Sequence, residues 1–114
     1  MKLNEIDIDS ITWQDWKDSR GKRHRASVLD AGEDGWNRTL ICIDAGHGIG
    51  SDHLAKTAPL EFLSGVGTYE LNGQSYVYEP NITLRLPAGS HFRLTRADCQ
   101  TLVILCVPPT PRVV

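Results

Sequence analysis

Apolar and polar residues alternate along much of this chain in short runs separated by turn residues. Ile82, Leu84 and Leu86 recur at every second position, which is the period of a strand with one buried face. No long window keeps helical spacing, and Thr12 to Asp18 is expected to form a turn of helix at most. The expected strands are Arg25 to Leu29, Arg38 to Asp44, Leu60 to Ser64, Val66 to Leu71, Ser75 to Tyr78, Ile82 to Leu86, Phe92 to Thr95 and Thr101 to Val107.

Turn residues between the runs define how the strands connect. Asn72-Gly73 separates two strand-like runs, and this dipeptide is a strong hairpin signal. The segment Pro87 to Gly89 stops the next run and forms a corner that is followed by His91. Many short strands with such turns indicate a sandwich, a barrel or a double-sheet roll.

Length and charge limit the function classes. The chain has 114 residues and a formal net charge of −2, so we expect one domain over residues 1–114 and no general attraction to nucleic acid or to an anionic membrane. No apolar run is long enough to cross a bilayer. Residues 1–10 lack the apolar block of a signal peptide, and the expected compartment is the cytoplasm.

Two groups of reactive or charged residues have ordinary explanations. The three cysteines show no Cys-x-x-Cys spacing, and we interpret Cys42 and Cys106 as core residues of strands and Cys99 as the most exposed one. A basic cluster, Arg20 to Arg25, could bind an anion or a phosphate. Because acidic residues flank it on both sides, the favoured interpretation is a solvated surface of mixed charge.

The span from about Arg38 to Val107 resembles a cupin. In that family, the first motif carries two histidines and a glutamate ahead of a glycine. When the motif is anchored on Gly65, the histidines fall on Ser51 and His53, and the glutamate falls on Ala58. The second motif is similar at Pro87-Ala88-Gly89, but its histidine position is Phe92 and its asparagine position is Arg96. The resemblance implies an all-β fold, a cupin-type double-stranded β-roll or jelly-roll barrel of two antiparallel sheets.

The departures from the motifs weaken the case for a metal site. A divalent metal needs several imidazole or carboxylate donors, and this alignment retains His53 alone. His91 lies one residue early, which on a strand reverses the side-chain face unless a bulge intervenes. We therefore interpret the chain as a non-catalytic or metal-free module that binds a small molecule in the barrel lumen. The candidate pocket residues are Ser51, His53, Ala58, Phe62, Leu84 and Phe92.

A rearranged metal site is the alternative. If the segment from Asp44 to His53 were extended, His47 and His53 would share a face, and His91 would add a third imidazole. Three imidazoles suffice for one divalent ion such as Zn, Fe, Mn, Ni or Cu. Such a protein would be a metal-dependent dioxygenase, isomerase or lyase that acts on a small organic substrate.

The two terminal segments differ in composition from the strand-forming middle of the chain. Residues 1–20 are expected to form a strand or a dimerisation arm, and residues 108–114 a proline-rich tail. A small β-roll has edge strands that need covering, and the resemblance implies pairing of two subunits. We therefore expect a homodimer, with a core that includes Phe62, Leu63, Leu84, Leu86, Leu102 and Ile104.

Overall fold

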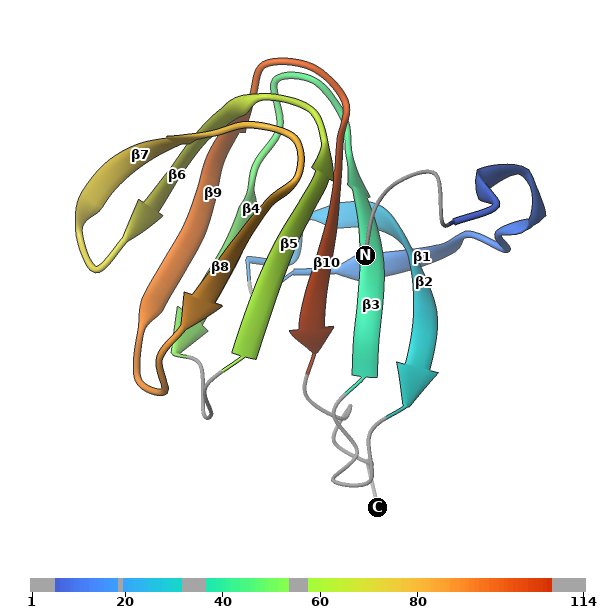
Figure 1. Cartoon of the computed structure of the whole chain (residues 1–114), viewed down its shortest axis with the longest axis horizontal. Coiled ribbons are helices and arrows are strands. Elements are labelled where there is room, and N and C mark those ends of the chain that lie inside the picture. Colours follow the sequence, from blue (N-terminus) through green and yellow to red (C-terminus); the bar gives the residue numbers. More distant parts are fainter. Residues whose placement is uncertain (1–5, 19, 32–36, 54–57, 108–114) are drawn as a thin grey trace.

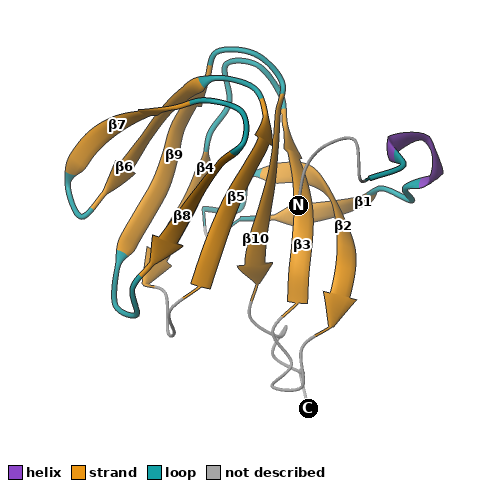
Figure 2. Ribbon diagram, viewed as in Figure 1, coloured by secondary structure: helices purple, strands orange, loops and turns teal. Residues whose placement is uncertain are grey.

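The computed structural model describes residues 6–18, 20–31, 37–53 and 58–107, and residues 31, 51–53, 58 and 107 by their backbone alone. Strands dominate this part of the chain (Figures 1 and 2). They are preceded by the 3-10 turn η2 (Ile8–Ser10). The strands are β1 (Gln14–Lys17), β2 (Arg23–Ala31), β3 (Asn37–Ile43), β4 (Ile49–His53), β5 (Ala58–Ser64), β6 (Gly67–Leu71), β7 (Gln74–Tyr78), β8 (Ile82–Leu86), β9 (His91–Ala97) and β10 (Thr101–Val107).

Two antiparallel sheets face each other, as Figure 1 shows. The larger sheet has six strands in the order β1-β2-β3-β10-β5-β8, and the smaller has four in the order β4-β9-β6-β7. Consecutive strands β5 and β6, β7 and β8, and β8 and β9 lie in different sheets, so the chain repeatedly crosses from one layer to the other. This confirms the expected double-sheet roll.

The strands expected from alternation are all present, and the structure has two others that alternation did not locate. The segment from Gln14 to Lys17, for which at most a helical turn was expected, is β1, and it pairs with Arg23 to Ala26 of β2. The segment from Ile49 to His53 is β4, whereas the glycines at 46, 48 and 50 favoured a loop here. β4 does not reach back to His47, so the extended segment from Asp44 to His53 that the alternative metal site required is wrong.

Asparagine and glycine make the tight turns that the sequence indicated. Asn72 has φ 51° and Gly73 has φ 84°, which are the two successive positive values of a type I′ hairpin turn between β6 and β7. Asn81, which takes the place of the family's glycine, has φ 67°. Asparagine tolerates this left-handed conformation, so the substitution preserves the turn into β8.

The main core lies between the two sheets. Side chains with almost no exposure come from both layers, and Phe62, Leu86, Phe92 and Val103 are among them. Phe62 and Leu86 were expected in the core, and Leu84, also expected there, is partly buried against it. Burial of such side chains contributes about 1.5–3 kcal/mol each relative to exposure.

A second core covers the outer face of the larger sheet. Its buried residues are Leu40, Cys42, Leu63, Leu102 and Ile104. Ile6, Ile8, Ile11 and Trp13 of the N-terminal segment pack against it. The expected core residues Leu63, Leu102 and Ile104 thus belong to this outer layer, and the N-terminal segment is engaged within its own chain.

The remaining expectations about the fold concern cysteines, membrane segments and the C-terminus. Cys42 is buried, Cys106 half-buried and Cys99 exposed, in agreement with the strand and turn positions assigned to them. Within the described residues, none of the helical structure has the length and apolarity to cross a bilayer. The proline-rich tail 108–114 lies outside the described residues.

Candidate functional site

One end of the barrel brings together the ends of four strands that carry candidate residues. β4 ends at His53 and β9 begins at His91, and these two positions are directly paired. In the other sheet, β5 begins at Ala58, which pairs with Leu86 at the end of β8. The register therefore places the motif segments of the sequence at a common end of the molecule.

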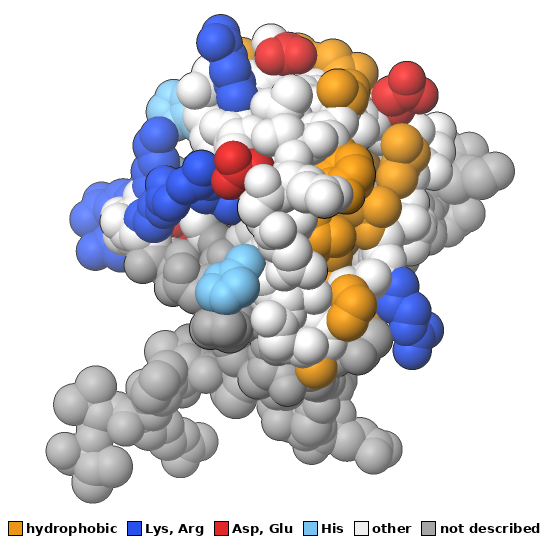
Figure 3. Space-filling model, turned by 90° about the vertical axis from the view of Figure 1, so that its left-hand side faces the viewer, with side chains coloured by type: hydrophobic (Ala, Val, Ile, Leu, Met, Phe, Trp, Pro, Cys, Tyr) orange, Lys and Arg blue, Asp and Glu red, His pale blue; other side chains and the backbone are white. Residues whose placement is uncertain are grey.

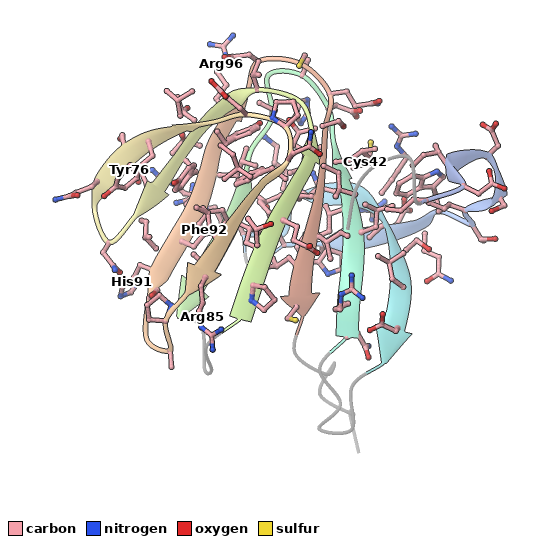
Figure 4. The ribbon with its side chains drawn as sticks, in the orientation of Figure 1. Cys42, Tyr76, Arg85, His91, Phe92 and Arg96 are labelled. Atoms are coloured by element: carbon pink, nitrogen blue, oxygen red, sulfur yellow. The ribbon has the colours of Figure 1, made fainter. Side chains whose placement is uncertain are left out.

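The start of β9 decides what faces the interior at this end. His91 is exposed, whereas Phe92 has 1% of its surface exposed, and burial continues to alternate through Leu94. Figure 4 shows Phe92 inside the barrel and His91 at its margin. Phe92 thus occupies the inward position that the family motif assigns to a histidine, and His91 lies on the opposite face of the strand.

Aromatic side chains fill the middle of the barrel. Phe62 and Tyr78 are stacked with ring centroids 4.3 Å apart, and the Tyr69 ring lies 5.8 Å from that of Phe92 and 5.9 Å from that of Phe62. Such pairs add about 0.5–1.5 kcal/mol beyond the burial of their area. The interior is therefore a packed aromatic core at these positions.

The polar groups within this core are internally satisfied. The Tyr78 hydroxyl is 2.7 Å from the Thr101 hydroxyl, and both residues are fully buried. Burial raises the pKa of the Tyr78 phenol and outweighs the lowering by this hydrogen bond. Burial likewise raises the pKa of Tyr69, and Tyr76 adds to the effect. Both phenols stay neutral at physiological pH and offer no anionic ligand.

The candidate pocket residues are distributed along the barrel. Phe62 is stacked with Tyr78 in the middle of the barrel. Leu84 is partly buried and pairs with Leu60. The backbones of Ser51, His53 and Ala58 lie at the end of β4 and the start of β5. Because the side chains of these three residues lie outside the described part of the structure, their assignment to a pocket stays a prediction.

The structure does not bring His47 and His91 together. The His47 carbonyl accepts a hydrogen bond from the amide of Ala97, the last residue of β9, whereas His91 is the first residue of that strand. The length of β9 separates them by roughly 20 Å. The expected cluster of His47 with His91 is therefore wrong, because the loop that carries His47 lies at the other end of the barrel.

The described side chains do not supply a ligand set for a metal. Among them, no group of three or more histidine, cysteine, aspartate or glutamate residues converges. Of the four ligand positions in the family motifs, position 92 is the one whose side chain is described, and Phe92 offers no donor atom. The residues that are described therefore do not fit the metal that the cupin motifs imply.

Comparison with known proteins identifies the fold. No family model matches the sequence, and no curated protein matches it. Among solved structures, a predicted oxalate decarboxylase from Thermotoga maritima is 14% identical, with a TM-score of 0.72 over 90% of this chain and 97% of that one. KdgF from Halomonas sp. is 18% identical, with a TM-score of 0.69 over 93% and 92% of the two chains.

A conserved protein of unknown function from Streptococcus pyogenes, SPY1581, is 24% identical, with a TM-score of 0.62 and 75% of each chain covered. A cupin-2 domain protein from Rhodospirillum rubrum is also similar. These likenesses show that the chain has the cupin fold. Because that fold supports enzymes of several kinds as well as other proteins, it leaves the activity open.

Proposed function

We propose that this chain is a metal-free cupin-fold module that binds a small apolar molecule at the barrel end where β4 ends and β9 begins. The observation that carries the proposal is the inward placement of Phe92 with 1% of its surface exposed. A phenyl ring at this position occupies volume and offers no donor atom, so it favours an apolar ligand over a hydrated ion.

Partly exposed apolar side chains at the margin of the core support the same proposal. Leu71, which pairs with Phe92, and Leu84 are partly buried and pack against the main core. They extend the apolar surface from the buried interior toward solvent. A small molecule that covered them would gain about 25 cal/mol for each Å² of apolar surface removed from water.

A fluorescence titration with N-phenyl-1-naphthylamine, an uncharged apolar dye, tests the binding role. We expect saturable enhancement with the unmodified protein and its loss in Leu84→Glu, because the new carboxylate would place a charge beside the apolar surface. Thr83→Glu introduces the same group at the neighbouring exposed position of β8 and is expected to bind the dye normally. Equal binding by both variants, or no saturation, would refute the proposal.

Elemental analysis tests the metal-free part of the proposal. Protein purified without an affinity tag, exposed to Zn, Fe, Mn, Ni and Cu and then desalted, is expected to retain far less than one equivalent of any of them. Little metal should be retained because the barrel end offers few donor atoms to replace the water shell of a metal ion.

A metal-dependent enzyme is a second candidate, which the direct pairing of His53 with His91 favours. This pairing brings two histidine positions to one end of the barrel without His47. One tightly held metal ion per chain, lost in both His53→Ala and His91→Ala, would replace the apolar-binding proposal with an enzyme of the dioxygenase, isomerase or lyase kind.

A further inference from the structure

A pocket with a volume of about 230 Å³ lies outside the barrel, where the turn between β1 and β2 meets β4 and β9. Its lining includes Asp18, Arg20 and Lys22 from the turn, Gly50 from β4, and Arg93 from β9. Arg93 alternates with the buried residues Phe92 and Leu94, so its side chain belongs to the outer face of the smaller sheet. The pocket is therefore separate from the apolar barrel end.

A single buried carboxylate builds the turn that forms one wall. Asp18 Oδ1 accepts hydrogen bonds from the backbone amides of Arg20 and Lys22, both at 2.9 Å. The Asp18 amide donates to the Lys22 carbonyl, which closes the turn. Both cationic residues are thus fixed at their backbone by one carboxylate oxygen.

The same carboxylate attaches the turn to the smaller sheet. Asp18 Oδ2 accepts a hydrogen bond of 3.0 Å from the amide of Gly50 and lies 3.3 Å from His24 Nε2. The side chains of Asp18 and His24 are 1% and 2% exposed. Both carboxylate oxygens therefore have hydrogen-bond donors, which stabilise the ionised form of Asp18 in this position.

Gly50 makes room for Arg20 on the surface of β4. A Cβ atom at position 50 would lie 2.7 Å from Cγ and 2.8 Å from Cδ of Arg20. The arginine stem therefore lies directly over the glycine, which holds the side chain beside the pocket. A larger residue at this position would displace it.

The pocket is lined by three cationic side chains against the one buried carboxylate. Arg93 donates to Glu70 Oε2 at 3.0 Å. Within the described residues, Arg20 and Lys22 have no ion-pair partner, and both are exposed. On the face that Figure 3 shows, lysine and arginine side chains gather toward one side. With the Asp18 carboxylate counted against them, Arg20 and Lys22 still leave the pocket with a net positive charge, which favours an anion.

We propose that this pocket binds the phosphate group of a small phosphorylated molecule. Arginine presents its N–H groups in a fork that matches phosphate oxygens, and lysine adds a point charge. A phosphate monoester carries a charge of about −1.5 to −2 at neutral pH, which complements Arg20 and Lys22. The pocket is smaller than the roughly 300–1,000 Å³ of sites for drug-sized ligands, and this volume favours a compact ligand.

An NMR titration of the whole protein with inorganic phosphate and with phenyl phosphate, in a phosphate-free buffer of low ionic strength, tests the proposal. We expect saturable shifts centred on the amides of Gly50, Leu94 and Thr95. Arg20→Gln is expected to weaken binding at least about tenfold through the loss of a charge-assisted contact. If Arg20→Gln does not fold, Lys22→Gln replaces it with the same expectation.

Arg85→Gln is the matched control, since it removes the same charge from exposed β8 of the larger sheet. It should bind phosphate as the unmodified protein does. Malonate, a dicarboxylate of similar charge, should bind at least about tenfold more weakly than phenyl phosphate if phosphate geometry is recognised. Unsaturable or scattered shifts, equal loss in Arg85→Gln, or equal binding of malonate would overturn the proposal, whatever the outcome of the apolar dye titration.

Discussion

Asp18 connects residues that are far apart in the sequence. Its carboxylate accepts hydrogen bonds from Arg20, Lys22 and Gly50, and Gly50 lies 32 positions away along the chain. Charge-assisted hydrogen bonds contribute about 1.5–3 kcal/mol each when a partner is lost. We expect Asp18→Asn to lower the free energy of unfolding at pH 7 by about 2–3 kcal/mol, as measured by urea denaturation. Asp44→Asn, which changes an exposed carboxylate 3.4 Å from Arg25, should cost less than about 1 kcal/mol.

The stabilisation by Asp18 is expected to depend on pH. Burial raises the pKa of Asp18, but the hydrogen bonds from Gly50, Lys22, Arg20 and His24 together lower it by more than burial raises it. The pKa of Asp18 in the folded protein therefore lies below its usual range. A lowered pKa contributes stability above the unfolded value of about 3.9. That stability is lost as the pH falls through the folded-state pKa. The difference between the unmodified protein and Asp18→Asn should therefore shrink from pH 6 to pH 3, and a constant difference would contradict this account.

At the scale of single residues, motif offsets located the inward position at Phe92 and the left-handed turn at Asn81. Both follow from local rules of alternation and turn chemistry. The role of Asp18 could not be predicted in this way. It depends on a contact with Gly50 that exists only once β4 and the β1–β2 turn have been brought together.

At the scale of elements, alternation predicted the strands that have a clear apolar face. Alternation did not locate β1 within residues 1–20, because this strand is short and mostly polar. It did not locate β4, because Gly48 precedes this strand and Gly50 lies within it. Both derive their stability from pairing, with β2 and β9 respectively. Tertiary pairing therefore overrides weak local preference in these strands.

β10 is buried on both faces, which distinguishes it from a strand with one solvated side. Val103 belongs to the main core and Ile104 to the outer core beneath the N-terminal segment. We expect Ile104→Ala to cost about 2–5 kcal/mol of unfolding free energy, measured by urea denaturation. Val28→Ala, at a position of β2 with 55% of its surface exposed, should change stability by less than about 0.5 kcal/mol.

A result in which Ile104→Ala is as mild as Val28→Ala would mean that the N-terminal segment does not cover the larger sheet in solution. Trp13 and Ile11 would then be free of the outer core that they contact here. Truncation of Ile104 thus tests an arrangement that alternation along β10 cannot specify, because a continuous apolar run is compatible with burial by any covering element.

At the scale of the whole molecule, the sequence predicted the two-sheet roll but not the division of its core. The N-terminal segment was expected to form a strand or a dimerisation arm. Gln14–Lys17 of this segment is strand β1, and Ile6 to Trp13 packs on the outer core of its own chain. Its short apolar pattern was recognisable in the sequence. The surface that it would cover depends on the arrangement of the sheets and could not be read from local spacing.

The homodimer stays a prediction, and the described edge strands suggest where it would form. β7 ends the smaller sheet, and its sequence, Gln-Ser-Tyr-Val-Tyr, contains no charge. By contrast, edge strand β1 carries Asp15 and Lys17, and edge strand β8 carries Arg85. Charged residues protect an edge from pairing, and an uncharged edge with exposed apolar side chains favours it. Tyr76 and Val77 of β7 are 41% and 69% exposed.

We therefore expect light scattering to give the mass of a dimer at micromolar concentrations, formed by two-fold pairing of β7 with β7 of a second copy. Val77→Lys should shift the mass toward the monomer, because like charges would face each other across the paired edges. Thr83→Lys adds the same charge to exposed β8 and should leave the dimer intact. A monomer mass for the unmodified protein would contradict the predicted homodimer. A dimer that persists in Val77→Lys but is lost in Thr83→Lys would assign the interface to the edge of the larger sheet.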